Sequence, residues 1–289
     1  MIFLGTGAAE CFPDPFCSCP ACTKALLSTD RKLKRRRSSL LLNQKNLIDF
    51  GPDVMHSCGE YSCSLAKLEN VFITHSHEDH LDIWNIGFMQ MAITKTNPIS
   101  LYMSKAAYKG LETVLSVLEE LPDNRLKEKI RTERQYYSFV PLEPYTEYKI
   151  DDMRVIAAKS NHRSFFPDEY SLNYLFDTPR GKLFYACDTG RFFSETVELL
   201  KEQALDILVI EGTFGATPLS VSATHLNTET LCEMIDKLKR NGGITCNTRI
   251  YVTHISHKGV FTHYDYEEHL QKRYGKKISV AYDGMNVAF

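Results

Sequence analysis

A histidine-rich motif in the middle of the chain sets strong limits on what the protein can fold into. Residues 74–80 read Thr-His-Ser-His-Glu-Asp-His and follow a short apolar run that predicts a strand. A strand that ends in a tight turn can present His75 and His77 to one cation, because alternate residues share a face. Asp79 and His80 can then turn toward a second cation nearby. The motif predicts a pair of metal ions that needs further ligands from elsewhere in the chain.

Three later residues offer those ligands, and each comes after a run that is typical of a strand. His162 follows Met153–Ala158, Asp188 follows Lys182–Ala186, and His254 follows Arg249–Val252. A lone histidine is more often a satisfied core or surface residue than a ligand, and an aspartate at such a place can simply form a turn. Together with the motif, however, the recurrence of the required residue types at strand ends favours a metal site.

The pattern of apolar residues predicts a mixed α/β protein. Short β-branched or apolar runs predict strands at Ile2–Leu4, Ser39–Leu42, Asn46–Asp49, Asn70–Ile73, Ile99–Met103, Met153–Ala158, Leu172–Phe176, Lys182–Ala186, Ile207–Ile210, Arg249–Val252 and Ile278–Ala281. Helical spacing at Leu111–Leu121 and Leu231–Leu238 predicts helices that cover the sheet faces. The polar segment at about 105–148 is expected to be a helical insertion outside the core of a single domain, residues 1–289.

Composition restricts the class of protein. The 289 residues contain 34 Lys and Arg against 36 Asp and Glu, a formal net charge of −2, and 43% of them are hydrophobic. These values are typical of a globular protein and exclude a global basic field for nucleic acid or anionic membranes. No apolar run reaches the roughly 18 residues of a membrane span, and the first residues do not read as a signal peptide. We expect a cytoplasmic protein without a membrane partner.

A second group of ligands lies near the amino terminus. Cys17, Cys19 and Cys22 have the spacing C-x-C-x-x-C. Three thiols so close together cannot all pair as disulfides, but they can supply three corners of a tetrahedral zinc site. We expect His257 to be the fourth ligand, because one strand end could then carry both this residue and His254.

Three weaker signals complete the reading of the chain. The segment Arg31–Arg37 has six cations in seven positions. It could grip phosphate groups, although a solvated approach to the next strand is the favoured interpretation. His263 has no motif around it and is expected to be exposed, while Cys187 is expected to be a packed thiol.

These residues together resemble the metallo-β-lactamase superfamily. Its H-x-H-x-D-H motif is matched in full, and so is the order of the downstream His, Asp and His. The resemblance implies a four-layer αββα sandwich with a dinuclear site along one edge. It also implies the ligands: His75, His77 and His162 for one ion, Asp79, His80 and His254 for the other, and Asp188 as a bridge.

The cysteine pattern is similar to that of the PhnP-like phosphodiesterase branch of the superfamily, which also carries the H-x-x-H pair. Further similarities are Asp49–Asp53 and, as in ribonuclease Z, Glu211–Phe214. The resemblance implies one structural Zn²⁺ and two catalytic divalent ions, Mn²⁺ or Zn²⁺ with Fe²⁺ as a third option. It also implies that His225 binds phosphate or donates a proton.

We therefore expect a metal-dependent hydrolase of a small phosphodiester, a cyclic one in the favoured case. A hydroxide shared by the two ions would attack phosphorus, oriented by Asp79, and His225 would stabilise the transition state or protonate the leaving group. One alternative is a ribonuclease Z-like nuclease that holds RNA on Arg31–Arg37, which makes nucleic acid a less favoured partner. Others are a lactone or thioester hydrolase and a non-catalytic zinc-dependent binding protein. The sequence does not decide whether the protein forms a homodimer.

Overall fold

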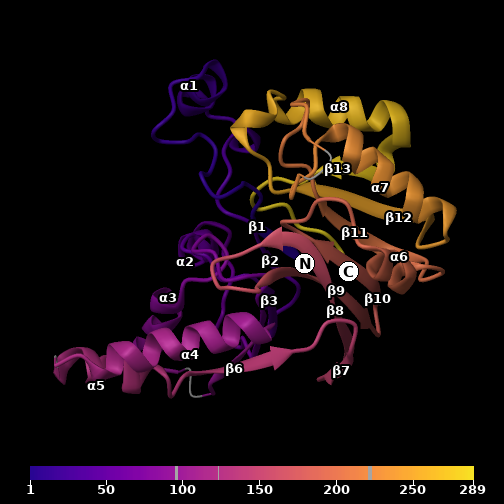
Figure 1. Ribbon diagram of the computed structural model, residues 1–289. Coiled ribbons are helices and arrows are strands. Elements are labelled where there is room, and N and C mark those ends of the chain that lie inside the picture. Colours follow the sequence, from indigo (N-terminus) through magenta and orange to yellow (C-terminus); the bar gives the residue numbers. More distant parts are fainter. Residues whose placement is uncertain (95–96, 123, 221–222) are drawn as a thin grey trace.

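The computed structural model has two β-sheets packed face to face between two layers of helices (Figure 1). It describes residues 1–94, 97–122, 124–220 and 223–289. The expected αββα sandwich is thereby confirmed. Within these ranges, no helix combines the length and the apolar character that a bilayer span requires.

The first sheet has the strand order β1-β2-β3-β4-β5-β6. Its strands are β1 (Ile2–Gly5), β2 (Ser39–Leu41), β3 (Asn46–Ile48), β4 (Asn70–Phe72), β5 (Ile99–Ser104) and β6 (Tyr137–Leu142). Strand β2 runs antiparallel to both of its neighbours, β1 and β3, whereas β3 to β6 are parallel. The helices of this half are α2 (Val54–Glu60), α3 (Ile83–Gly87), α4 (Lys105–Glu120) and α5 (Asn124–Glu133), with short 3-10 turns at Arg31–Leu33 and Phe88–Met91.

The second sheet has the order β13-β12-β11-β10-β9-β8-β7. Its strands are β7 (Glu147–Ile150), β8 (Met153–Arg163), β9 (Tyr170–Thr178), β10 (Gly181–Ala186), β11 (Leu205–Glu211), β12 (Ile244–Thr253) and β13 (Ile278–Val280). Strands β7 to β10 form an antiparallel meander, and β10 to β13 are parallel. The helices are α6 (Ser194–Leu200), α7 (Thr228–Arg240) and α8 (His263–Tyr274), with 3-10 turns at His257–Gly259 and Gly275–Lys277, and α1 (Pro20–Leu27) lies on the amino-terminal segment.

The core between the sheets is built from large apolar side chains of both. The ring centroid of Phe72 on β4 lies 4.9 Å from that of Phe176 and 5.7 Å from that of Tyr174, both on β9. Full burial of one such side chain contributes about 1.5–3 kcal/mol. The Tyr174 hydroxyl also donates a hydrogen bond to the carbonyl of Ile73. The residue that precedes the histidine motif is therefore tied to the opposite sheet.

Helix α7 begins at a capping box that fixes the loop before it. The side-chain oxygen of Asn227 accepts from the Thr230 amide at 3.0 Å, and the Thr230 hydroxyl accepts from the Asn227 amide at 3.0 Å. These bonds satisfy two amides that the first helical turn leaves without partners. Because His225 lies two residues before the cap, the same bonds limit where its side chain can go.

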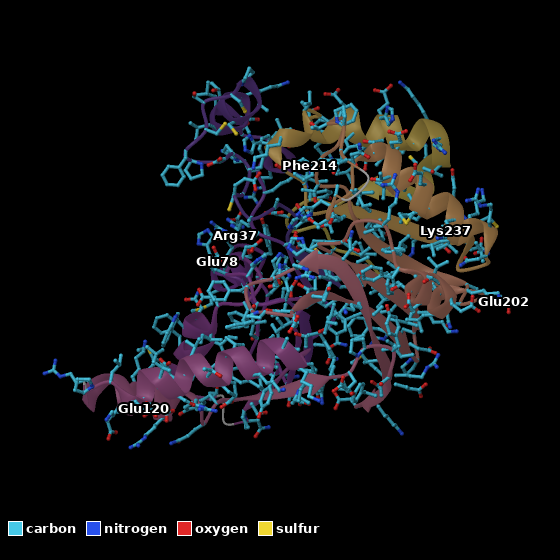
Figure 2. All side chains as sticks on the ribbon, viewed as in Figure 1. Arg37, Glu78, Glu120, Glu202, Phe214 and Lys237 are labelled. Carbon is cyan, nitrogen blue, oxygen red and sulfur yellow. The ribbon has the colours of Figure 1, made fainter. Side chains whose placement is uncertain are left out.

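The region 105–148 differs in part from the sequence prediction. Helices α4 and α5 were expected, and the last residue of α4, Glu120, lies at the lower left of Figure 2, away from the sheets. However, Leu111 and Leu115 of α4 pack in the core against the first sheet, so the expectation that the segment lies outside the core is wrong. From Tyr137 onward it forms strands β6 and β7 instead of helix.

Candidate metal centre

The parallel half of the second sheet brings three of the polar residues to one edge. Strands β10, β11 and β12 are adjacent and parallel, so their carboxyl ends coincide. Asp188 and His254 follow β10 and β12 closely, and Glu211 is the last residue of β11. The histidine motif follows β4 of the first sheet and meets them there. Chain segments far apart in sequence therefore share one site, as the sequence predicted.

The first ligand group is made by three imidazoles. The Nε2 atom of His75 lies 2.9 Å from Nδ1 of His77, and Nε2 of His162 lies 3.5 Å from that same Nδ1. All three nitrogens are within 4.8 Å of one another. Such a spacing fits one cation held by three histidines.

The second ligand group combines imidazoles and carboxylates. The Nε2 atom of His80 lies 3.1 Å from Oδ2 of Asp79 and 2.8 Å from Oδ2 of Asp188. The Nε2 atom of His254 lies 3.2 Å from that same oxygen of Asp188. Asp188 also groups with His162, so it lies between the two sets in the position expected of a bridging ligand.

Both of these Nε2 atoms are buried and, within the described residues, form no hydrogen bond of acceptable geometry. A buried polar atom without a partner costs about 1–3 kcal/mol. A divalent cation would satisfy His80, His254 and the two carboxylates together, so the residues present fit a metal pair.

Asp49 orients two of the histidines from behind. Its Oδ2 atom lies 2.7 Å from Nδ1 of His80, and it accepts from the Thr74 hydroxyl at 2.9 Å. That hydroxyl in turn lies 3.0 Å from Nδ1 of His75. Because the Nδ1 atoms are engaged in this way, the Nε2 atoms of His75 and His80 are left for the metal side.

Glu211 repeats this arrangement on the other sheet. Its Oε1 atom accepts from Nδ1 of His225 at 3.0 Å. Its Oε2 atom accepts from the Thr213 hydroxyl, which lies 2.9 Å from Nδ1 of His254. Two buried carboxylates thus each orient one histidine directly and a second one through a threonine.

The histidines of the site differ in their pKa values. Burial lowers the pKa of His162 to about 4. Burial opposes the charged form of His225 as well, but the Glu211 carboxylate outweighs it and raises the pKa of His225 to about 9. Likewise, Asp79 and Asp188 overcome burial and raise the pKa of His80 well above its usual value.

Three residues of the site have backbone conformations that are uncommon for residues other than glycine. The φ angles are 58° at Asp49, 47° at Asp188 and 57° at His254. Such conformations cost of order 1–3 kcal/mol each and persist where the surrounding structure fixes them. The contacts around these three strand-end residues hold them in this conformation.

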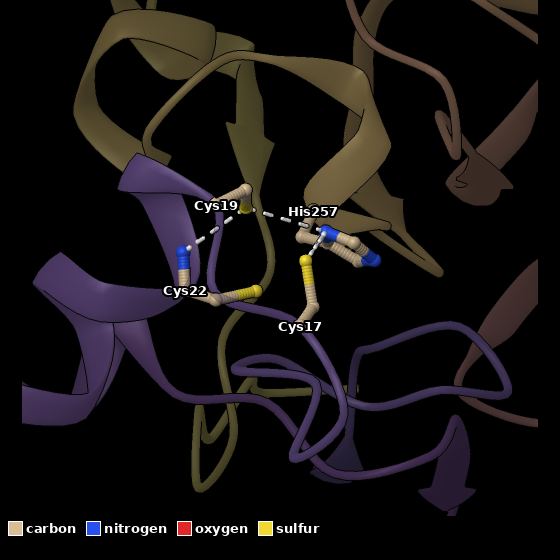
Figure 3. A group of neighbouring side chains, drawn as sticks. All are labelled: Cys17, Cys19, Cys22 and His257. Atoms are coloured by element: carbon tan, nitrogen blue, oxygen red, sulfur yellow. Dashed lines mark hydrogen bonds between the residues drawn. The ribbon is translucent and has the colours of Figure 1, made fainter.

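The cysteine group is assembled as the sequence predicted (Figure 3). The Nδ1 atom of His257 lies 3.7 Å from Sγ of Cys17 and 3.6 Å from Sγ of Cys19, and Cys22 completes the group within 4.8 Å. The Cys22 amide bonds to Sγ of Cys19, and this bond, followed by the one from His257, lowers the pKa of the Cys19 thiol to about 6. Three free thiols and one imidazole fit a tetrahedral Zn²⁺.

The basic segment Arg31–Arg37 does not present one phosphate-binding face. Arg35 is buried, and its guanidinium Nη2 lies 2.9 Å from Nδ1 of His263. Arg36 pairs with Glu60. These cations serve contacts within the fold, and the expectation that His263 is exposed is wrong because this partner lies inside the protein.

A cleft of about 250 Å³ opens onto the metal-ligand residues. Its walls include His225, the ring of Phe214 and the ammonium-bearing side chain of Lys258. The ring centroid of Phe214 lies 5.7 Å from that of His225. The cleft therefore offers an aromatic surface, a cation and an imidazole beside the metal ligands.

Sequence comparison agrees with this geometry. Residues 31–245 match the family model described as anti-Pycsar protein Apyc1, which spans more than half of the chain. The chain belongs to the Apyc1 family, within the metallo-β-lactamase superfamily. No curated protein matches it significantly in sequence.

Solved structures share the fold of this Apyc1-family chain at low identity. A diphosphatase of the PhnP family superposes with a TM-score of 0.73 at 22% identity, covering 100% of this chain and 96% of that one. Zn²⁺-bound PqqB from Methylobacterium extorquens gives 0.73 at 14%, covering 100% and 99%. The short form of human tRNase Z gives 0.62 at 17%, covering 99% and 98%.

The structure brings together every residue that the sequence analysis placed in the two metal groups, and it adds residues without an assigned role. Asp49 and Glu211 lay in segments noted only for similarity, and their bonds to the histidines depend on tertiary contacts. Glu169, which accepts from the amide of Ser76 at 2.8 Å, had no signal in the sequence. Cys187 is buried as expected, but its Sγ lies 3.5 Å from Oδ2 of Asp188.

Proposed function

We propose that this Apyc1-family chain is a metal-dependent phosphodiesterase that hydrolyses a small, cyclic phosphodiester. The observation that carries the proposal is the pairing of His225 with Glu211 at the rim of the metal-ligand groups. A histidine held in this way is suited to proton transfer and is not needed to complete either ligand set. A purely structural metal site would be closed, whereas this one opens onto a cleft.

The residues that would hold the catalytic ions are those of the two groups. One ion would be bound by His75, His77 and His162, the other by Asp79, His80 and His254, with Asp188 between them. Two divalent ions, as Mn²⁺, Zn²⁺ or Fe²⁺, supply charge neutralisation on phosphoryl oxygens and an activated water.

Three side chains of the cleft would donate the proton and bind the substrate. The Nδ1–H group of His225 is engaged by Glu211, so its Nε2 atom is the one able to give a proton to the departing sugar oxygen. Lys258, more than half exposed, can offset charge on the phosphate group as substrate enters. Phe214 supplies an apolar wall against the organic part of the substrate.

The test is hydrolysis of a ribose cyclic phosphate by the metal-loaded protein and its variants, because the sugar oxygen of this substrate needs a proton to depart. His225→Ala should retain its metals and lose about 100-fold or more in kcat, the usual contribution of a general acid. His269→Ala, which removes an exposed histidine on α8, is the matched control and should hydrolyse at the normal rate. Equal rates for all three proteins would reject the role given to His225.

A substrate panel separates this proposal from its rivals. We expect ribose cyclic phosphates to be cleaved in preference to transfer-RNA precursors and to lactones. Arg35 and Arg36 are engaged in contacts within the fold, which speaks against an RNA-holding surface formed by the whole of Arg31–Arg37. Preferential cleavage of the RNA precursor would instead favour the nuclease.

A further inference from the structure

A second cavity, larger than the metal cleft, lies on the far side of the loop that joins β8 to β9. Its volume is about 650 Å³, against about 250 Å³ for the cleft. It lies between helix α4, the turn after β6 and loop residues 164–169. We call it the α4 pocket and define it by Lys105, Lys109, Leu142, Lys159, Phe166 and Tyr170, which line it.

Among the residues that the structure describes, one cation of the α4 pocket has no side-chain partner. Lys105 pairs with Glu143 at 3.1 Å, and the ammonium of Lys159 lies 3.7 Å from the ring centroid of Tyr170. Lys109 makes no side-chain hydrogen bond or ion pair with any residue that the structure describes. Three lysines face the carboxylates of Glu143 and Asp168, so the pocket favours an anion.

Apolar groups make up the rest of the walls. Leu142 and Leu172 are fully buried beneath the pocket. The rings of Phe166 and Tyr170 stand at its side, and Val114 adds an exposed apolar surface. A volume of this size, with apolar walls and a few charged groups, is typical of a site for a small organic molecule.

The loop that forms one wall of the pocket also carries Glu169, which hydrogen-bonds to the histidine motif. Phe166 packs on Gly110 of α4 so closely that a Cβ there would lie 2.3 Å from the ring. Three residues later, the buried carboxylate of Glu169 accepts from both the amide and the hydroxyl of Ser76. Ser76 stands between His75 and His77, so a shift of this loop reaches two metal ligands.

We propose that the α4 pocket binds a small organic anion with an aromatic body, held by Lys109 and Phe166, and that its occupancy adjusts the metal centre through Glu169. Binding of such an anion to the α4 pocket does not depend on which reaction the protein catalyses. We assign the bound molecule as an effector, because the residues of the candidate metal groups do not line the pocket.

The first experiment measures binding of anilinonaphthalene sulfonate by fluorescence to the metal-loaded full chain. We expect saturable binding that Lys109→Glu weakens about fivefold or more, since one charge-assisted contact becomes a repulsion. Lys239→Glu, the same change on α7, is the control and should bind like the unmodified protein. Uncharged phenylnaphthylamine should bind both lysine variants equally. Equal affinity of the sulfonate for all three proteins would overturn the site.

The second experiment tests the link to the metals without using hydrolysis. The rate at which a chelator removes the catalytic ions is measured with and without saturating sulfonate. We expect the probe to change this rate in the unmodified protein and in Lys239→Glu. Glu169→Gln should still bind the probe but lose the effect. If the probe leaves the rate of metal release unchanged in every protein, the coupling between the α4 pocket and the metal centre is wrong, whatever the outcome for phosphodiester hydrolysis.

Discussion

Glu211 is buried and His225 is partly exposed, and one carboxylate oxygen of Glu211, Oε1, accepts from the imidazole Nδ1 at 3.0 Å and from the amide of Thr189 at 2.6 Å. Thr189 follows Asp188, the residue placed between the two ligand groups. A single oxygen atom therefore fixes the position of the imidazole relative to the loop that carries the bridging carboxylate. Loss of the Glu211 charge should therefore lower the catalytic rate more than it lowers the stability of the fold.

The variant Glu211→Gln tests that pair. The amide keeps the size of the side chain but accepts a weaker hydrogen bond, so we expect kcat to fall about 10- to 100-fold, as for other partners that orient site residues. Metal content should stay close to normal, because Glu211 accepts a hydrogen bond from Thr213, and it is Thr213 that contacts Nδ1 of His254. A variant with full activity would show that His225 needs no such partner.

Asp49→Asn tests the opposite carboxylate. We expect the affinity for the ion at His80 to fall about 10- to 100-fold, because the bond to its Nδ1 atom is lost or weakened. Calorimetric titration of metal into the chelator-treated protein measures the change. Asp53→Asn is the control, since that carboxylate pairs with Arg37 and, in the part of the chain that the structure describes, bonds no residue of the candidate metal groups. If both variants bind metal equally well, the orienting role of Asp49 is wrong.

The buried imidazole of His263 predicts a pH dependence of stability. Burial, followed by the nearby Arg35, lowers the pKa of His263 to about 3. In the unfolded chain this imidazole binds a proton below about pH 6.5, whereas in the folded protein it stays neutral until a much lower pH. The free energy of unfolding therefore falls as the pH is lowered below about 6.5, by about 1.4 kcal/mol per pH unit.

Urea unfolding of His263→Gln and of the control His269→Gln between about pH 7 and about pH 5 checks this sign. The first variant should lose less stability on acidification than the unmodified protein, and the control should behave like the unmodified protein. Parallel pH profiles for all three proteins would contradict the assignment.

Metal removal separates the cysteine group from the catalytic centre. Cys17, Cys19, Cys22 and His257 form a closed set, so their ion should resist a chelator that strips the open catalytic pair. In Cys22→Ser we expect about one zinc fewer per chain after chelation. Cys246→Ser, which alters an exposed cysteine outside the group, should keep that zinc. Loss of zinc from both variants, or from neither, would refute the structural site.

Much of the fold was accessible from the sequence because alternating and apolar runs mark its buried strands. The strands that escaped prediction, β6 and β7, are the outer strands of their sheets. Pro141 interrupts the pattern of β6, and an edge strand tolerates proline because one side of it needs no ladder hydrogen bonds. Strand β7 has only four residues, and only its last residue, Ile150, is buried. Edge strands carry a weak sequence signal for these physical reasons.

The residues of the candidate metal groups were predictable because metal chemistry demands particular side chains at strand ends. Their orienting partners were not. The bond from Asp49 to His80 and the contact of Thr213 with His254 depend on how strand ends meet across two sheets. The left-handed backbone at Asp188 is likewise a result of the folded context. Sequence therefore identifies the donor atoms, and only the structure shows what holds them in place.

Anomalous diffraction from crystals of the Mn²⁺-loaded protein would locate the catalytic ions. We expect two neighbouring peaks, one beside His75, His77 and His162 and the other beside Asp79, His80 and His254, with Asp188 in contact with both. A map without peaks at this edge, or with a single peak that Asp188 does not touch, would rule out the proposed metal pair.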